Sequence, residues 1–151
     1  MQSDKKRRIA ISLIVISTLT FWLVFSPHQK IAKTQVCIEN HCIDIAIADT
    51  PKKQEQGLMY IKHMSENSWM LFVFEKEDIY TFWMKNTLIP LDILRINNNK
   101  EIVDIQEATP CISKKCETYT PQNEATYVLE INKGLCKKRG INTGQKISIS
   151  Y

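Results

Sequence analysis

Short segments in which apolar and polar residues alternate run through much of this chain, and such alternation predicts β-strands with one buried face. The pattern is clearest over residues 42–48 and 146–151. Shorter runs bounded by turn-forming residues predict further strands over residues 36–38, 92–96, 101–107 and 125–131. The chain is therefore predicted to be mainly β.

Two short helices are predicted between these strands. Thr50 can cap a helix that has Pro51 at its first position, and Gly57 can end it. Residues 133–139 predict a second helical segment. About eight strands and two short helices, with turn signals between them, predict a β-sandwich or a partly open barrel. A length of 151 residues is typical of one domain.

The densest aromatic stretch is residues 69–96, which holds two of the three tryptophans and three of the five phenylalanines. Its apolar runs, 69–74 and 79–84, predict two strands, and the acidic residues 75–78 between them predict a turn. The second run passes from Trp83 directly into polar residues 85–87. This change is typical of a pocket floor with a polar rim, and equally of a core strand that leaves the interior.

Charge separates the N-terminus from the rest of the chain. Four of the 20 basic residues and one of the 16 acidic residues lie in the first eight positions, which leaves 16 basic against 15 acidic residues. The remainder is near neutral, which argues against a nucleic-acid-binding domain, because such a domain needs a basic face.

The 17 residues 9–25 carry no charge and are mostly apolar. As a helix they would rise about 26 Å, close to the roughly 30 Å of a hydrocarbon core. A cleaved signal peptide is the rival interpretation, but Pro27 would stand just after the best cleavage site. We therefore expect residues 1–8 to be a cytoplasmic tail, 9–25 an uncleaved membrane anchor and 26–35 a tether. The domain would then lie on the periplasmic or extracellular side.

Five cysteines are compatible with such a compartment, where disulfides persist. Cys37 and Cys42 would face each other across a hairpin with a two-residue turn, at a separation that a disulfide can span. Cys111 and Cys116 would staple a loop that contains proline and threonine. Cys136 is then left as a free, buried thiol. The spacing of the pairs fits zinc poorly, and we predict neither a metal nor a cofactor.

Several sequence blocks identify a family that this chain resembles. The chain is similar, over residues 36–151, to the DUF192 (UPF0127) family of small domains of unknown function. The resemblance implies a mainly β, jelly-roll-like fold and often export, and it implies no activity. Family members often have Arg where Ile61 stands and Pro where Glu117 stands, and the Cys37–Cys42 pair is an addition. The matching blocks are Ile47-Ala48-Asp49-Thr50-Pro51, Gly57-Leu58-Met59, Met70-Leu71-Phe72-Val73-Phe74, Phe82-Trp83-Met84-Lys85-Asn86-Thr87-Leu88-Ile89-Pro90-Leu91-Asp92 and Tyr127-Val128-Leu129-Glu130.

Within the family pattern, Trp83, Lys85, Asn86 and Asp92 form a polar cluster beside an aromatic platform. We predict that they bind a small ligand, a glycan or an envelope protein, with Glu107 as an additional carboxylate. The competing interpretation is structural: the lysine lies along apolar surface while the polar side chains bond their own loop.

Two other classes of function stay open. An extracytoplasmic enzyme could use Lys85 with a carboxylate such as Glu107, although the sequence has no Ser/His/Asp arrangement, phosphate-binding loop or metalloprotease motif. A copper-handling protein could use thioethers and an imidazole, although methionine inside apolar runs ordinarily fills core space. The candidate copper ligands are Met59, Met64, Met70, Met84 and His63.

The anchor gives the first testable prediction. The full-length protein should stay in the membrane fraction and keep its N-terminus, because the basic cluster at positions 5–8 precedes an uncharged segment of spanning length. Fractionation followed by N-terminal sequencing of the mature protein tests this. A mature chain that begins near Pro27 or later would show that the segment is a cleaved signal.

Overall fold

The computed structural model describes residues 34–113 and 115–150. The predicted tail, the predicted membrane segment and tether residues 26–33 lie outside the described residues. Within the described ranges, no helix combines the length and hydropathy needed to cross a bilayer.

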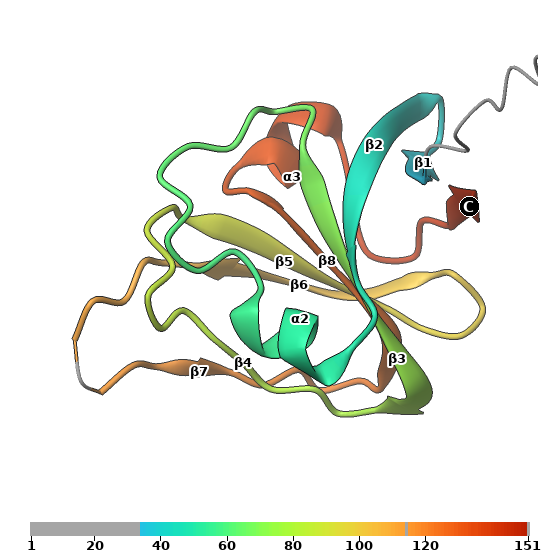
Figure 1. Ribbon diagram of the computed structural model, residues 1–151. Coiled ribbons are helices and arrows are strands. Elements are labelled where there is room, and N and C mark those ends of the chain that lie inside the picture. Colours follow the sequence, from blue (N-terminus) through green and yellow to red (C-terminus); the bar gives the residue numbers. More distant parts are fainter. Residues whose placement is uncertain (1–33, 114, 151) are drawn as a thin grey trace, which may run out of the picture. The chain divides into compact units, whose positions relative to one another are not determined.

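The domain is built around one curled sheet of seven strands in the order β6-β5-β8-β3-β2-β1-β9 (Figure 1). Neighbouring strands are antiparallel except for the parallel pair β2 and β3. The strands are β1 (Gln35–Ile38), β2 (His41–Ala48), β3 (Trp69–Asp78), β5 (Leu91–Ile96), β6 (Ile102–Ala108), β8 (Ala125–Asn132) and β9 (Ile147–Ser150).

The curl brings the two edges of the sheet together at one corner. The Ile102 N–H donates to Gln145 O over 2.9 Å, and the Ile147 N–H donates to Lys100 O over 2.8 Å. The sheet is therefore a half-barrel that is closed at this corner. The prediction of a mainly β fold with two short helices is confirmed, and the sheet has a partly open form.

Smaller elements cover both faces of the sheet. The helix α2 (Pro51–Gln56) and a ribbon formed by β4 (Phe82–Trp83) and β7 (Thr118–Tyr119) lie on the outer face, and α3 (Leu135–Arg139) packs on the inner face (Figure 1). Both helices agree with their predicted positions. Thr50 Oγ1 accepts a bond from Lys53 N, and Gly57 ends α2 at a positive φ of 44°.

The core has two parts because strand side chains alternate between faces. Leu94 and Ile96 point into the inner core, which also contains Trp69, Leu129 and Ile131. On the outer face, Leu91 and Ile93 join a second core that lies under the ribbon and also contains Phe72, Met84 and Val128. Every residue of β5 is consequently buried.

The aromatic stretch differs from its prediction in one respect. The acidic residues 75–78, predicted as a turn, continue β3 to Asp78, which pairs with Ala125. Their side chains are exposed. The strand therefore extends past the core into solvent, where charged side chains keep their hydration. The strand predicted over residues 79–84 shrinks to Phe82–Trp83.

Charged side chains are buried on the outer face. Arg95 is completely buried, its Nη2 donates to Tyr119 O over 2.7 Å, and its guanidinium lies 5.5 Å from the Phe82 ring centre. Arg95 thereby ties the ribbon to the sheet. Glu130 is only 4% exposed, and burial raises its pKa to about 8, although the charge of Arg95 opposes this shift.

The raised pKa of Glu130 predicts a pH-dependent stability. The folded protein keeps this proton, whereas the unfolded chain releases it near pH 4.5, the ordinary pKa. Stability from the protonated carboxyl is fully present below pH about 4.5 and is lost as pH rises through about 8. Chemical denaturation between pH 4.5 and 9 should show this loss in the wild type, and Glu130→Gln should flatten it. Equal slopes in the two proteins would contradict the buried protonated state.

Candidate functional site

The sheet separates the predicted site residues into two groups. Trp83, Lys85 and Asn86 lie with α2 on the outer face. Asp92 alternates with outer-face neighbours on β5, so its side chain points to the inner face, toward α3. Glu107 is paired with Asp92 in the strand register and lines the same hollow on that side. The structure therefore brings together three of the five predicted ligand-binding residues.

The outer group lines a hollow of about 440 Å³, which we call the α2 groove. Two aromatic side chains in it are unusually accessible: Tyr60 is 67% exposed and Trp83 is 48% exposed. Ammonium, carboxylate and amide groups complete its lining. The α2 groove consists of Lys52, Glu55, Gln56, Met59, Tyr60, Trp83, Lys85 and Asn86.

A reciprocal pair of hydrogen bonds shapes the centre of the α2 groove. The Tyr60 N–H donates to Asn86 O over 2.9 Å, and Asn86 Nδ2 donates to the Tyr60 hydroxyl over 2.9 Å. Both residues have positive φ, 65° for Tyr60 and 58° for Asn86. Such backbone strain costs roughly 1–3 kcal/mol per residue and is typical of sites where a side chain must hold one direction.

Trp83 and Lys85 owe their exposure to the residue between them. Met84 is 1% exposed and packs into the outer core, so its two neighbours project the other way in this extended segment. Lys85 Nζ lies 5.0 Å from the centre of the Trp83 ring, within the range of a cation–π contact. The lysine charge is therefore held at the edge of the aromatic surface.

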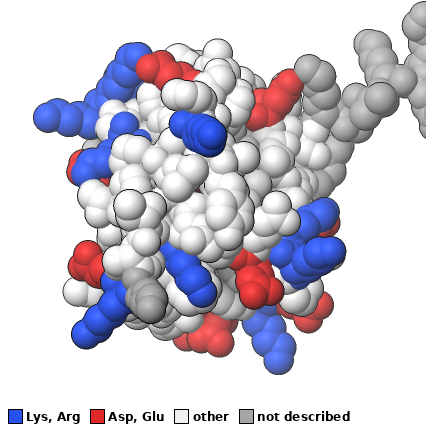
Figure 2. Space-filling model, turned by 60° about the vertical axis from the view of Figure 1, so that its left-hand side comes forward, with Lys and Arg blue, Asp and Glu red and all other residues white. Residues whose placement is uncertain are grey.

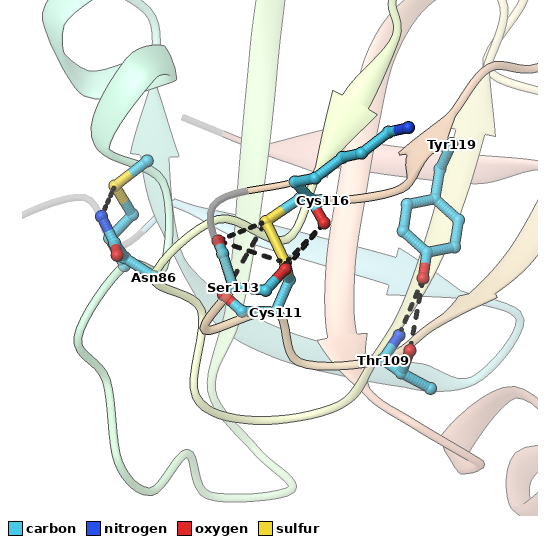
Figure 3. The surroundings of a disulfide bond; sticks show 8 residues. Asn86, Thr109, Cys111, Ser113, Cys116 and Tyr119 are labelled. Carbon is cyan, nitrogen blue, oxygen red and sulfur yellow. Dashed lines mark hydrogen bonds between the residues drawn. A yellow bond between two sulfur atoms is a disulfide. The ribbon is translucent and has the colours of Figure 1, made fainter.

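A disulfide loop lies beside Asn86 and supports the Lys85–Asn86 turn (Figure 3). The Asn86 N–H donates to Cys111 O over 3.1 Å, and the Cys111 N–H donates to Met84 O over 3.2 Å. Cys111 is bonded to Cys116, so the predicted pairing is confirmed. The Cys37–Cys42 disulfide is also confirmed and spans the β1–β2 hairpin.

The inner group has structural partners. The Asp92 carboxylate accepts hydrogen bonds from Gly134 N and Cys136 N, both over 3.0 Å, and it thereby caps α3. Glu107 forms an ion pair with Lys133 over 3.0 Å. Cys136 is free and buried, as predicted, and its burial raises the pKa of the thiol. The ligand-binding roles of Asp92 and Glu107 remain predictions, and they concern a separate hollow of about 370 Å³.

The methionines of the copper hypothesis mostly fill the outer core. Met84 is buried there, and Met64 and Met70 pack against it. Met59 instead lines the α2 groove, where Asn86 Nδ2 approaches its sulfur within 4.0 Å. Among the described residues, no group of three or more His, Cys, Asp or Glu side chains is arranged to hold a metal ion.

Sequence reasoning missed Tyr60 and the polar side chains that α2 contributes to the groove. Tyr60 directly follows the Gly57-Leu58-Met59 block, and a large aromatic residue outside any predicted strand was the available signal.

Figure 2 shows one face of the domain, on which uncharged surface predominates and charged side chains of both signs project mainly around its outline.

Comparison with known proteins decides the family. A model of the DUF192 family, described as "Uncharacterized ACR", matches residues 34–149. The chain belongs to the DUF192 family. A curated relative of this DUF192 protein is a UPF0127 protein from Thermococcus gammatolerans, 28% identical over 109 residues. The match covers 69% of the chain and 65% of the relative, so the chain spans slightly less than two thirds of that protein.

Two crystal structures are similar to this DUF192 domain. One is a candidate transcription regulator from Sinorhizobium meliloti, with a TM-score of 0.70, 31% identity, and coverage of 78% of this chain and 92% of that one. The other is a protein of unknown function from Novosphingobium aromaticivorans, with a TM-score of 0.69, 30% identity, and coverage of 77% and 83%. These comparisons establish the family and the fold.

The positive φ of Asn86 gives a prediction that separates backbone from side-chain effects. Asn86→Ala and Asn86→Gly both remove the bond to the Tyr60 hydroxyl, but only glycine adopts this backbone conformation without strain. We expect Asn86→Ala to be less stable than Asn86→Gly by about 1 kcal/mol in urea unfolding. Equal stabilities would show that the turn relaxes without its αL conformation.

Proposed function

We propose that the domain is a binding module that holds a sugar residue of a glycan in the α2 groove. The observation that carries this proposal is the exposure of Tyr60 and Trp83 in one hollow with a polar lining. Large exposed aromatic side chains are unfavourable in water unless a partner covers them, and they supply much of the contact area in binding sites.

A sugar residue matches both kinds of surface in the groove. Its C–H face can cover an aromatic ring, while its hydroxyl groups need donors and acceptors around the edge. Lys52 and Lys85 supply donors, Glu55 supplies an acceptor, and the amides of Gln56 and Asn86 supply both. A volume of about 440 Å³ lies within the range of small-molecule sites.

The enzyme hypothesis has less support. Catalysis by Lys85 with Glu107 requires both groups to reach one substrate, and the sheet lies between them. Glu55 is the carboxylate that shares the groove with Lys85. A probe that is consumed, rather than only bound, would favour an enzyme that uses this pair.

The proposed site of action is outside the cytoplasm, with residues 9–25 as the membrane tether. The two disulfides support an oxidising compartment, where such bonds persist. The partner would then be a glycan or glycoconjugate of the cell envelope or its surroundings.

A glycan array tests the function directly. The full-length protein in mild detergent should retain a defined set of glycans, and Trp83→Ala should abolish this retention because the stacking surface is lost. Lys85→Ala should weaken binding by about 10- to 150-fold, the equivalent of one charge-assisted hydrogen bond. It should change the free energy of unfolding by no more than about 0.5 kcal/mol.

Lys100→Ala is the matched control, because Lys100 also lies against an aromatic ring, 3.3 Å from the centre of Tyr127, but outside the groove. It should bind like the wild type. If Trp83→Ala and Lys85→Ala both retain full binding, the glycan site lies elsewhere. If the wild type binds no glycan and instead captures an envelope protein, the module recognises protein.

A further inference from the structure

Several oxygen atoms of its own loop lie close to the sulfur atoms of the Cys111–Cys116 disulfide (Figure 3). Ser113 Oγ lies 3.5 Å and Lys115 O lies 4.0 Å from Cys111 Sγ. Ser113 O lies 3.9 Å from Cys111 Sγ and 3.7 Å from Cys116 Sγ, and Cys111 O lies 4.0 Å from Cys116 Sγ.

The nearest of these oxygens, Ser113 Oγ, suits a thiol better than a disulfide. A disulfide has no proton, so it cannot donate to any of them, whereas each thiol formed by reduction has one S–H to donate. The Ser113 hydroxyl already donates to Lys115 O over 2.7 Å, so its Oγ faces Cys111 Sγ as an acceptor. A Cys111 thiol could therefore donate to Ser113 Oγ, and a hydrogen bond that only the reduced form makes favours a readily reducible disulfide.

We propose that Cys111–Cys116 is a thiol–disulfide exchange site, and that its reduction releases the Lys85–Asn86 turn and disables the α2 groove. The co-reactant is a dithiol, such as the active site of a thiol oxidoreductase. One thiolate of the dithiol attacks a protein sulfur and forms a mixed disulfide, and its second thiol resolves this bond. The protein gains two electrons and two protons as two thiols, and the dithiol becomes a disulfide.

The coupling to the groove runs through the backbone of Cys111. Its C=O accepts from Asn86 and its N–H donates to Met84, so its two bonds lie on either side of Lys85. Asn86 keeps its strained conformation only while such contacts hold it. When the loop is reduced and looser, both hydrogen bonds of the Cys111 backbone weaken. The side-chain amide of Asn86 can then lose its hydrogen bond to the Tyr60 hydroxyl.

The second disulfide of the protein is a natural control. Cys37–Cys42 has the same sequence separation of five residues, so closing either loop costs a similar entropy. Its cysteines lie in β1 and β2, which pair along four registered positions, and β1 also pairs with β9. The hairpin is therefore held by its strands when that disulfide opens.

Redox titration of the full-length protein in mild detergent tests the exchange site. The protein is equilibrated with mixtures of reduced and oxidised dithiothreitol, its thiols are alkylated, and each cysteine peptide is quantified by mass spectrometry. Cys111–Cys116 should be half reduced at a dithiol-to-disulfide ratio about tenfold lower than Cys37–Cys42. Equal ratios, or earlier reduction of Cys37–Cys42, would overturn the assignment.

Amide hydrogen exchange tests the coupling without any ligand. The Asn86 amide should exchange at least tenfold faster in reduced wild type and in a Cys111→Ser/Cys116→Ser variant, but not in Cys37→Ser/Cys42→Ser. If the backbone amide of Asn86 exchanges no faster after Cys111 and Cys116 have been reduced and alkylated, the coupling is overturned. The reduced wild type gives this test even if the double variant does not fold. Loss of glycan retention on reduction rests on the proposed function, whereas the exchange result does not.

Discussion

The strand β5 carries two buried charges that point to opposite faces of the sheet, and the elements on both faces depend on them. Arg95 binds the carbonyl oxygens of Ile93 and Tyr119 on the outer face and thereby holds the ribbon. Asp92 binds two backbone N–H groups of the α3 segment on the inner face. Removing either side chain would leave the buried backbone groups that it binds without their partner, which typically costs about 1–3 kcal/mol. One central strand therefore fixes the covers of both cores.

This arrangement explains how the α2 groove keeps a defined geometry although few of its side chains are buried. No residue of α2 is buried, and the helix is held by its caps and by Gln54, whose Nε2 donates to Val73 O over 2.8 Å. The opposite wall comes from Trp83 of β4, which belongs to the ribbon that Arg95 anchors, and from the segment that follows β4. Directional hydrogen bonds, together with the burial of Leu58 and Met84 in the outer core, thus set the distance between the two walls.

Local patterns predicted what is local in this fold. Helix α2 was predictable because its cap, its first proline and its terminal glycine are adjacent in sequence, and both disulfides were predictable because each pair is five residues apart. The continuation of β3 through four charged residues was not, since composition there favours a turn while the ladder continues to Asp78. Nor could the sequence assign Asp92 to the face opposite Lys85, because the residues between them leave the ribbon and enter β5.

Tyr60 illustrates the same limit for the site. It lies 26 residues from Asn86 in the chain, yet the two exchange backbone and side-chain hydrogen bonds. Neither positive φ is favoured by residue type alone, although asparagine accepts it more readily than tyrosine does. The pair exists because the segment after α2 and the turn after β4 are each held from elsewhere, by the outer core and by Cys111 respectively. A site of this kind keeps its geometry only while both supports hold, so we expect a change at the adjoining Cys111–Cys116 disulfide to alter a surface that itself contains no cysteine.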